Sequence, residues 1–149
     1  DSHMTSPSPE GEAAAHAMVH AYQEAGLKPE DITYINAHGT STGLNDKYET
    51  IAIKKALGEE QAHKVKINST KSMTGHMLGG TGAVEAAVCA LSIRDGFIHQ
   101  TIGYTTPDPE CDLDYCVDGP VEMPVNAALS NSLGFGGHNA TLCFKKCVD

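Results

Sequence analysis

The chain has 149 residues and a formal net charge of −9, from 19 acidic and 10 basic residues. Hydrophobic residues make up 40% and charged residues 19%, a composition ordinary for one globular domain. The acidic balance argues against a nucleic-acid partner, which would need a clustered basic surface. No apolar stretch approaches the roughly 20 residues that span a bilayer, and no basic-then-apolar leader is present. The sequence therefore predicts a cytoplasmic protein without a membrane partner.

The first half of the chain predicts two helices and a strand between them. A helix is expected over residues 10–25, where small and apolar side chains recur at helical spacing. Residues 32–36 are rich in β-branched and aromatic types and predict a strand. The next helix begins at Asn45 or Asp46, with Glu49 placed to complete a capping box.

The second half predicts a buried helix and three more strands. Residues 77–93 are apolar almost all round, so this helix is expected to be buried on every side. The strands are expected over residues 65–69, 125–130 and 140–145, the last two joined by a loop over residues 131–139. Alternating strands and helices followed by a strand pair predict an α/β fold, with helices packed on a mixed β-sheet.

The five cysteines are odd in number and lack the spacing of a zinc site. Free thiols in a reducing compartment are expected. A disulfide between Cys111 and Cys116 is the less favoured alternative. None of the cysteines, and no serine, has the context of a nucleophile.

Two histidine motifs at the ends of predicted strands are the most informative feature. They read N-A-H-G-T-S-T over residues 36–42 and S-T-K-S-M-T-G-H over residues 69–76. In open α/β sheets, ligands bind where strands end in this way. The imidazoles of His38 and His76 and the ammonium of Lys71 could stabilise an enolate or oxyanion in a dry site. The motifs predict part of an active site.

Glu85 lies among apolar residues of the predicted buried helix. A buried carboxylate needs a partner, and Lys71 is the natural candidate, with a water-filled edge as the alternative. His76 is expected to open the same helix, where the helix dipole favours a neutral imidazole.

Smaller polar and glycine-rich segments add candidate binding groups. Thr40 and Thr42 could bind a substrate amide or satisfy turn amides. The turn over residues 134–137 could offer backbone N–H groups to an oxyanion, with a plain hairpin as the alternative. Phe135, between glycines, is placed to cover a cavity.

With N-S-x-G-F-G-G-x-N over residues 131–139, these motifs resemble the C-terminal half of a β-ketoacyl-[acyl-carrier-protein] synthase, nearest to the elongating synthase II of bacterial fatty-acid synthesis. The resemblance runs from His3 to Lys145. It implies the thiolase-like fold, in which two α/β halves form a five-layer α-β-α-β-α core in a homodimer. It also implies a decarboxylative Claisen condensation of malonyl-acyl-carrier-protein with an acyl-enzyme thioester, without a cofactor.

The resemblance assigns the catalytic roles. His38 and His76 match the two histidines that hydrogen-bond the malonyl thioester oxygen and assist decarboxylation. Lys71 matches the lysine that organises the site, and Glu85 matches its partner. The acyl carrier protein is the implied protein partner.

The resemblance also assigns substrate-binding positions. Thr40 and Thr42 match positions along the pantetheine arm. Phe135 matches the gating phenylalanine of the acyl pocket, with Gly136 and Gly137 as its flexible neighbours. Some members hold a structural monovalent cation, which is not required, at the positions of Asn36, Glu85 and Asn131.

Parts of the family pattern are missing from this chain. The nucleophilic cysteine belongs to the N-terminal half, and the first strand of the C-terminal half is absent too. The resemblance thus implies that residues 1–149 are one C-terminal ketosynthase domain, inactive alone and exposing an apolar face. Leu133 stands where many members have phenylalanine, which bears on the acyl pocket. Residues 1–4 match either a tag-cleavage remnant or a related native run.

Four alternatives remain from the sequence. One is a non-catalytic ketosynthase-like subunit that controls chain length or binds, for which the catalytic residues would be unnecessary. Another is a fragment of a polyketide ketosynthase. A thiolase would carry a cysteine in the last glycine-rich turn, and residues 133–139 contain none. A metal-dependent hydrolase using His38, His76 and His138 lacks a neighbouring carboxylate ligand.

Overall fold

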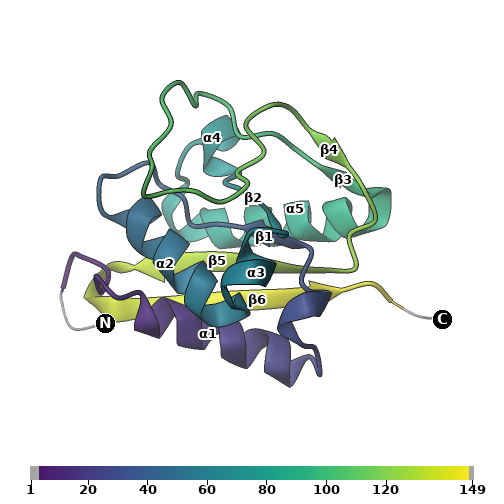
Figure 1. The fold of residues 1–149 in the computed structure, drawn as a ribbon, viewed down its shortest axis with the longest axis horizontal. Helices are drawn as coiled ribbons and strands as arrows, with labels where there is room; N and C mark the ends of the chain where they lie inside the picture. Colours follow the sequence, from purple (N-terminus) through teal and green to yellow (C-terminus); the bar gives the residue numbers. More distant parts are fainter. Residues whose placement is uncertain (1–3, 148–149) are drawn as a thin grey trace.

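The computed structural model describes residues 4–147, so His3, where the resemblance starts, lies outside the described residues. Its centre is a four-stranded mixed sheet in the order β2-β1-β5-β6, between α1 and α2 on one face and α5 on the other (Figure 1). β1 runs parallel to β2 and β5, and β6 pairs antiparallel with β5. The predicted α/β fold with a mixed sheet is confirmed.

The main elements are α1 (Glu12–Glu24), β1 (Tyr34–Asn36), α2 (Asn45–Leu57), β2 (Lys66–Asn68), α4 (Lys71–Thr74), α5 (Thr81–Asp95), β5 (Ala127–Gly134) and β6 (His138–Lys145). The short ones are η1 (Pro29–Asp31), α3 (Glu59–Ala62), η2 (Leu78–Gly80), β3 (Phe97–Ile98), β4 (Val121–Glu122) and η3 (Phe135–Gly137). No helix within residues 4–147 is long and apolar enough to cross a membrane. All five cysteines are free, as expected.

Strand alternation divides the buried side chains into two cores. Ile35 and Leu129 point to the face covered by α1 and α2, where they join Met18 and Ile53 in the larger cluster. Tyr34 and its neighbours on the opposite face pack with residues of α5 and β3 in a smaller cluster. Because successive side chains of a strand alternate between faces, the short strand β1 contributes side chains to both cores.

The predicted loop over residues 131–139 is wrong. β5 continues to Gly134 and β6 begins at His138, and these two residues pair directly. The connection is only three residues long, with Gly136 and Gly137 at φ values of 79° and 77°, where a side chain would be strained. The polar residues of this segment do not favour a strand by their local preference. Pairing between β5 and β6 stabilises them as strand.

The prediction that residues 77–93 form a helix buried on every side is also wrong. A 3-10 turn precedes α5, and only one face of α5 is buried, through Thr81, Glu85, Cys89 and Ser92. The outward face is apolar but exposed, at Ala83, Val84, Ala87, Ala90 and Leu91. The helix therefore buries its polar side chains and leaves an apolar face without a covering layer among the described residues.

Candidate active site

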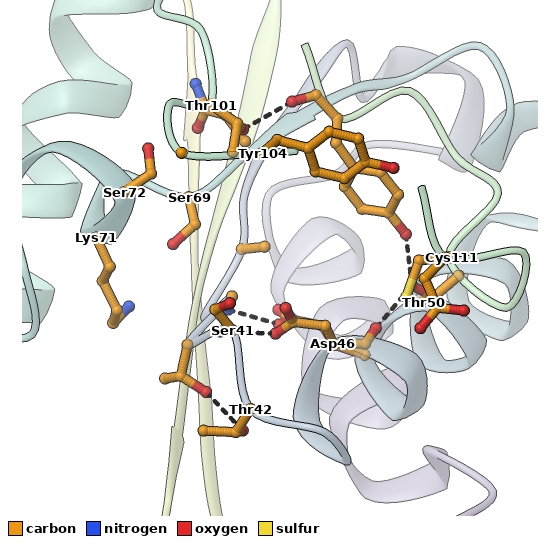
Figure 2. Close-up of a pocket in the computed structure, with 18 of the residues that line it drawn as sticks. Ser41, Thr42, Asp46, Thr50, Ser69, Lys71, Ser72, Thr101, Tyr104 and Cys111 are labelled. Atoms are coloured by element: carbon orange, nitrogen blue, oxygen red, sulfur yellow. Dashed lines mark hydrogen bonds between the residues drawn. The ribbon is translucent and has the colours of Figure 1, made fainter. Parts of the chain in front are cut away.

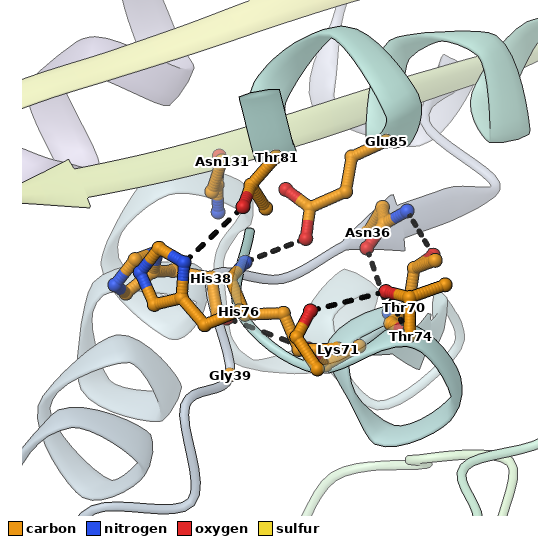
Figure 3. A network of polar contacts seen from close by, with 12 residues as sticks. Asn36, His38, Gly39, Thr70, Lys71, Thr74, His76, Thr81, Glu85 and Asn131 are labelled. Carbon is orange, nitrogen blue, oxygen red and sulfur yellow. Dashed lines mark hydrogen bonds and ion pairs between the residues drawn. The ribbon is translucent and has the colours of Figure 1, made fainter. Parts of the chain in front are cut away.

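The two histidine motifs come together at one edge of the sheet. β1 and β2 are adjacent parallel strands, with Asn36 paired to Asn68, so the turns that follow them lie side by side. The rings of His38 and His76 lie edge to face, with centroids 5.6 Å apart and an interplanar angle of 86°. Figure 3 shows both imidazoles close to Lys71. The structure therefore brings these three groups together.

The backbone of the first turn is held by a carboxylate from α2. The N–H groups of His38 and Gly39 donate to the two oxygens of Glu49, at 2.8 and 2.9 Å. The side-chain amides of Asn45 and Asn131 donate to the same carboxylate, at 3.3 and 3.2 Å. Glu49 is 3% exposed, and burial raises its pKa against the lowering effect of these hydrogen bonds. The carboxylate thus fixes where His38 leaves the strand.

Glu49 has a different role from the predicted one. The predicted capping box is wrong, because α2 begins after Leu44 without a side-chain capping bond and Glu49 turns inward instead. A signal was present, since Glu49 is spaced three, four and seven residues from Ala52, Ile53 and Ala56, all buried on α2. A carboxylate on such a stripe needs buried donors, which the facing turn provides.

His38 is poised as a neutral group. Desolvation lowers its pKa to about 4, with smaller contributions from the charge of Lys71 and from His76. A neutral imidazole retains one N–H and one acceptor nitrogen. At neutral pH the ring can therefore donate a hydrogen bond without carrying a positive charge.

Lys71 and Glu85 form the predicted buried pair. The ammonium of Lys71 lies 2.5 Å from Oε1 of Glu85, and the two residues are 8% and 1% exposed. Burial raises the pKa of Glu85, and the hydrogen bond and charge of Lys71 act in the opposite direction. The other oxygen, Oε2, is buried without a hydrogen-bond partner among residues 4–147. Because Glu85 is buried, its side chain does not reach a water-filled edge, which was the alternative.

His76 lies five residues before α5 rather than at its first turn, which corrects the predicted position. The backbone N–H of Leu78 donates to Nδ1 of His76 at 3.1 Å, and Oγ1 of Thr81 lies 3.1 Å from the same nitrogen. Because a backbone N–H can only donate, Nδ1 acts as the acceptor here. In the neutral ring the hydrogen is then on Nε2, so the contacts of Nδ1 set the tautomer.

Two cavities flank the His38 turn. The larger, of about 1010 Å³, is lined by both histidines, Lys71 and Phe135. The smaller, of about 470 Å³, lies between the turn and the loop that carries Tyr104, and its wall is rich in hydroxyl groups (Figure 2). The site therefore opens to space on two sides, and the reactive groups face the larger one.

The predicted substrate-binding residues lie at the rims of these cavities. Thr40 and Thr42 line both cavities and contact each other through their hydroxyls at 3.0 Å. Phe135, on the hairpin connection, is 80% exposed and borders the larger cavity. It fills no core position, as its sequence context indicated.

The three residues linked to a monovalent cation have separate partners. Both side-chain ends of Asn36 contact Thr70, since Nδ2 donates to its Oγ1 at 2.7 Å and Oδ1 accepts from its N–H at 3.3 Å. Asn131 donates to Glu49, and its oxygen accepts from Thr141. Of the three, Glu85 has a buried carboxylate oxygen, Oε2, without a hydrogen-bond partner among residues 4–147.

Comparison with known proteins agrees with this geometry. Residues 1–105 match the family model described as the C-terminal domain of β-ketoacyl synthase. The chain is 54% identical over 144 residues to 3-oxoacyl-[acyl-carrier-protein] synthase 2 of Staphylococcus aureus (strain COL), covering 97% of this chain and 34% of the relative. The Synechocystis protein of the same name is 53% identical with the same coverage. The chain thus spans about a third of the length of these relatives.

Solved ketosynthases share the fold. A type II polyketide ketosynthase in complex with its acyl-carrier protein has a TM-score of 0.94 at 41% identity, covering 99% of this chain and 36% of that one. A β-ketoacyl synthase from Burkholderia phymatum has a TM-score of 0.89 at 35% identity, covering 99% of this chain and 35% of that one. The predicted thiolase-like architecture is confirmed.

Proposed function

Because the chain belongs to the β-ketoacyl synthase family, we propose that it is the C-terminal part of an elongating 3-oxoacyl-[acyl-carrier-protein] synthase. The observation that carries the proposal is the shared cavity, onto which His38, His76 and Lys71 open together. The reaction is the decarboxylative Claisen condensation of malonyl-acyl-carrier-protein with an acyl group held on the enzyme.

In the first step the bond between the malonyl carboxylate and the α-carbon breaks, and carbon dioxide leaves. The electron pair passes into an enolate, whose oxygen accepts hydrogen bonds from the imidazole N–H groups of His38 and His76. Fixed donors aimed at developing charge in a water-poor site are among the strongest catalytic devices. The lowered pKa of His38 supports this role, since the ring is neutral at pH 7 and still carries one N–H that can donate a hydrogen bond.

In the second step the α-carbon attacks the acyl thioester carbonyl, a carbon–carbon bond forms and the cysteine thiolate leaves. That cysteine belongs to the N-terminal part of the enzyme. Lys71, paired with Glu85, supplies positive charge beside the two rings. Thr40 and Thr42 line the path of the pantetheine arm, and Phe135 gates the acyl pocket.

The hairpin around Phe135 has the features of a gate. Gly136 and Gly137 adopt positive φ values and directly follow the exposed Phe135. Glycines give this connection the backbone freedom that a swinging side chain requires. Leu133, earlier on the same hairpin and also on the cavity wall, is proposed to tune the acyl pocket.

A structural monovalent cation would fit beside Glu85. Its Oε2 is buried and unpartnered among the described residues, and the side-chain oxygens of Asn36 and Asn131 each retain a second lone pair. These three residues would hold the ion and thereby neutralise the second carboxylate oxygen. The condensation chemistry itself needs no cofactor.

The whole enzyme is proposed to be a cytoplasmic homodimer that works with acyl carrier protein. Two features support a missing N-terminal half. The apolar outer face of α5 is exposed, and β6 pairs only with β5 among residues 4–147, which leaves its other edge open to a further strand. Residues 1–149 are accordingly one C-terminal domain and inactive alone.

The test uses the complete synthase, with malonyl- and saturated acyl-carrier-protein as substrates. Wild-type enzyme is expected to release carbon dioxide and form the 3-oxoacyl product, whereas His76→Ala lowers decarboxylation about 100- to 1000-fold. His16→Ala, on the exposed face of α1, is the control and leaves the rate unchanged. Full decarboxylase activity in His76→Ala would contradict the proposal.

A second candidate is the ketosynthase of a polyketide synthase, favoured by the likeness to the type II polyketide enzyme. Such an enzyme extends an unreduced β-ketoacyl chain, whereas the fatty-acid enzyme extends a saturated one. Offering both primers separates the two substrates. No condensation with either primer, in the presence of both halves, would favour a non-catalytic chain-length subunit.

A further inference from the structure

A chain of hydrogen bonds outside the proposed catalytic group leads to the residue that precedes Lys71. Oγ1 of Thr70 lies 2.7 Å from Nδ2 of Asn36 and 2.9 Å from Nε2 of His99. Thr70 is 3% exposed and is the N-cap residue of the short helix α4. Figure 3 shows Thr70 between Asn36 and the α4 turn. The hydroxyl makes no capping bond to α4, and it links the residue before Lys71 to Asn36 and His99 instead.

The direction of each bond follows from the groups involved. Nδ1 of His99 lies 2.8 Å from the carbonyl oxygen of Gln100, which can only accept, so Nδ1 carries the hydrogen. Nε2 of the neutral ring is then an acceptor. Because the Asn36 amide donates to Oγ1 of Thr70, the hydroxyl hydrogen is free to point at His99. The Thr70 hydroxyl is thus held from both sides in one orientation.

The segment that carries His99 makes two further contacts, one with the end of β2 and one with the Lys71 turn. The carbonyl oxygen of His99 accepts from Nδ2 of Asn68 at 2.7 Å. The N–H of Ile102 donates to Oγ of Ser72 at 3.2 Å. The residues on both sides of Lys71 are therefore tied to residues 99–102, which belong to neither histidine motif.

We infer that His99 is a positioning residue for Lys71, acting through the hydroxyl of Thr70. This inference rests on the proposed function for its kinetic consequence, but the displacement of Lys71 has an independent readout. The charge of Lys71 contributes to the lowered pKa of His38, so a shift of the ammonium away from the ring moves that pKa upward.

Two substitutions at one position separate the hydrogen bond from the side chain's bulk. His99→Asn keeps a donor at the place of Nδ1, for the Gln100 carbonyl, but does not reach Thr70. His99→Gln places an oxygen near the position of Nε2 and can accept from the Thr70 hydroxyl. A role in packing alone would lower the stability of both variants without changing the activity of the folded protein.

The experiment measures malonyl decarboxylation and the titration of His38 in the complete synthase. In His99→Asn, kcat is expected to fall roughly 10- to 100-fold with KM unchanged, because small misplacements of a charged group reduce rates steeply. The His38 midpoint should rise above about 4. His99→Gln should restore both values to near wild type.

The possible results distinguish the inference about His99 from the proposed function. A His99→Asn enzyme that is folded, with wild-type kcat and an unchanged His38 midpoint, would overturn the inference. If His99→Asn does not fold, Thr70→Val, which keeps the shape and removes the hydroxyl, takes its place and must give the same losses. A wild-type synthase without condensing activity would refute the proposed function instead, while the His38 midpoint would still decide whether His99 positions Lys71.

Discussion

The two turns that form the site are fixed by the same means but for different purposes. Each follows a parallel strand, and each is held by a buried carboxylate from the next long helix, Glu49 on α2 or Glu85 on α5. Glu49 accepts from backbone and amide N–H groups, whereas Glu85 accepts from the ammonium of Lys71. The first turn therefore has its backbone locked, and the second has a charged side chain locked.

The difference shows how one fold supplies both shape and charge. The groups that donate to Glu49 in the described part of the chain are neutral, and burial raises the pKa of its carboxyl. Lys71 compensates Glu85, and the same ammonium helps to keep His38 neutral. The first carboxylate thus fixes the backbone that carries an imidazole, and the second holds a charge that adds to the effect of burial on the pKa of that imidazole.

The largest effect is expected from breaking the ion pair between Lys71 and Glu85. Glu85→Ala leaves the buried ammonium of Lys71 without its partner, which should destabilise the complete protein by about 3–5 kcal/mol. Replacing both residues, as Lys71→Met with Glu85→Leu, should recover most of this stability because no buried charge remains. Urea denaturation of the two variants checks the claim. A double variant no more stable than Glu85→Ala would contradict it.

A smaller loss of stability is expected from changing Glu49, which holds the turn at His38. Glu49→Gln keeps the shape but replaces one acceptor oxygen by a donor, so one of the N–H groups of His38 and Gly39 loses its bond. An unsatisfied buried donor costs about 1–3 kcal/mol. Glu60→Gln, exposed on α3, is the matched control and should change stability by less than about 0.5 kcal/mol. Equal denaturation midpoints for the two variants would show that the Glu49 contacts are dispensable.

The pH dependence of stability should distinguish the carboxylate from the imidazole. A raised pKa means that Glu49 contributes stability below its ordinary value of 4.5 that is lost as the pH rises through the folded value. His38, with a pKa lowered from 6.5 to about 4, contributes stability above 6.5 that is lost as the pH falls through this window. Glu49→Gln should remove only the decline above pH 4.5. Denaturation midpoints of wild type and variant across pH 4–8 measure this, and parallel curves would refute it.

The sequence was sufficient for the site's principal groups because they follow strand ends directly. His38, His76 and Lys71 are brought together by the pairing of two adjacent parallel strands. The Lys71–Glu85 pair followed from the cost of an isolated buried charge. Glu49 was missed because a carboxylate near a helix start fits a cap equally well, and only the tertiary contact with the β1 turn decides between them.

Other differences arise from long-range packing. The residues of β5 and β6 nearest the hairpin look like loop in isolation and become strand only through pairing with each other. The apolar pattern of α5 predicts a fully buried helix, yet Val84 and Leu91 are exposed in this chain. The described residues contain no layer that covers this face, and no property of the helix alone could have predicted its exposure.

The most direct test of the account is the charge of His38 in the complete protein, followed by NMR as a function of pH. A neutral His38 ring at pH 7, with a titration midpoint at about 4, is expected. Lys71→Met should move the midpoint upward, because a neighbouring positive charge is removed. A wild-type midpoint near the ordinary 6.5, unaffected by Lys71→Met, would contradict the claim that the paired turns hold a neutral donor in the site.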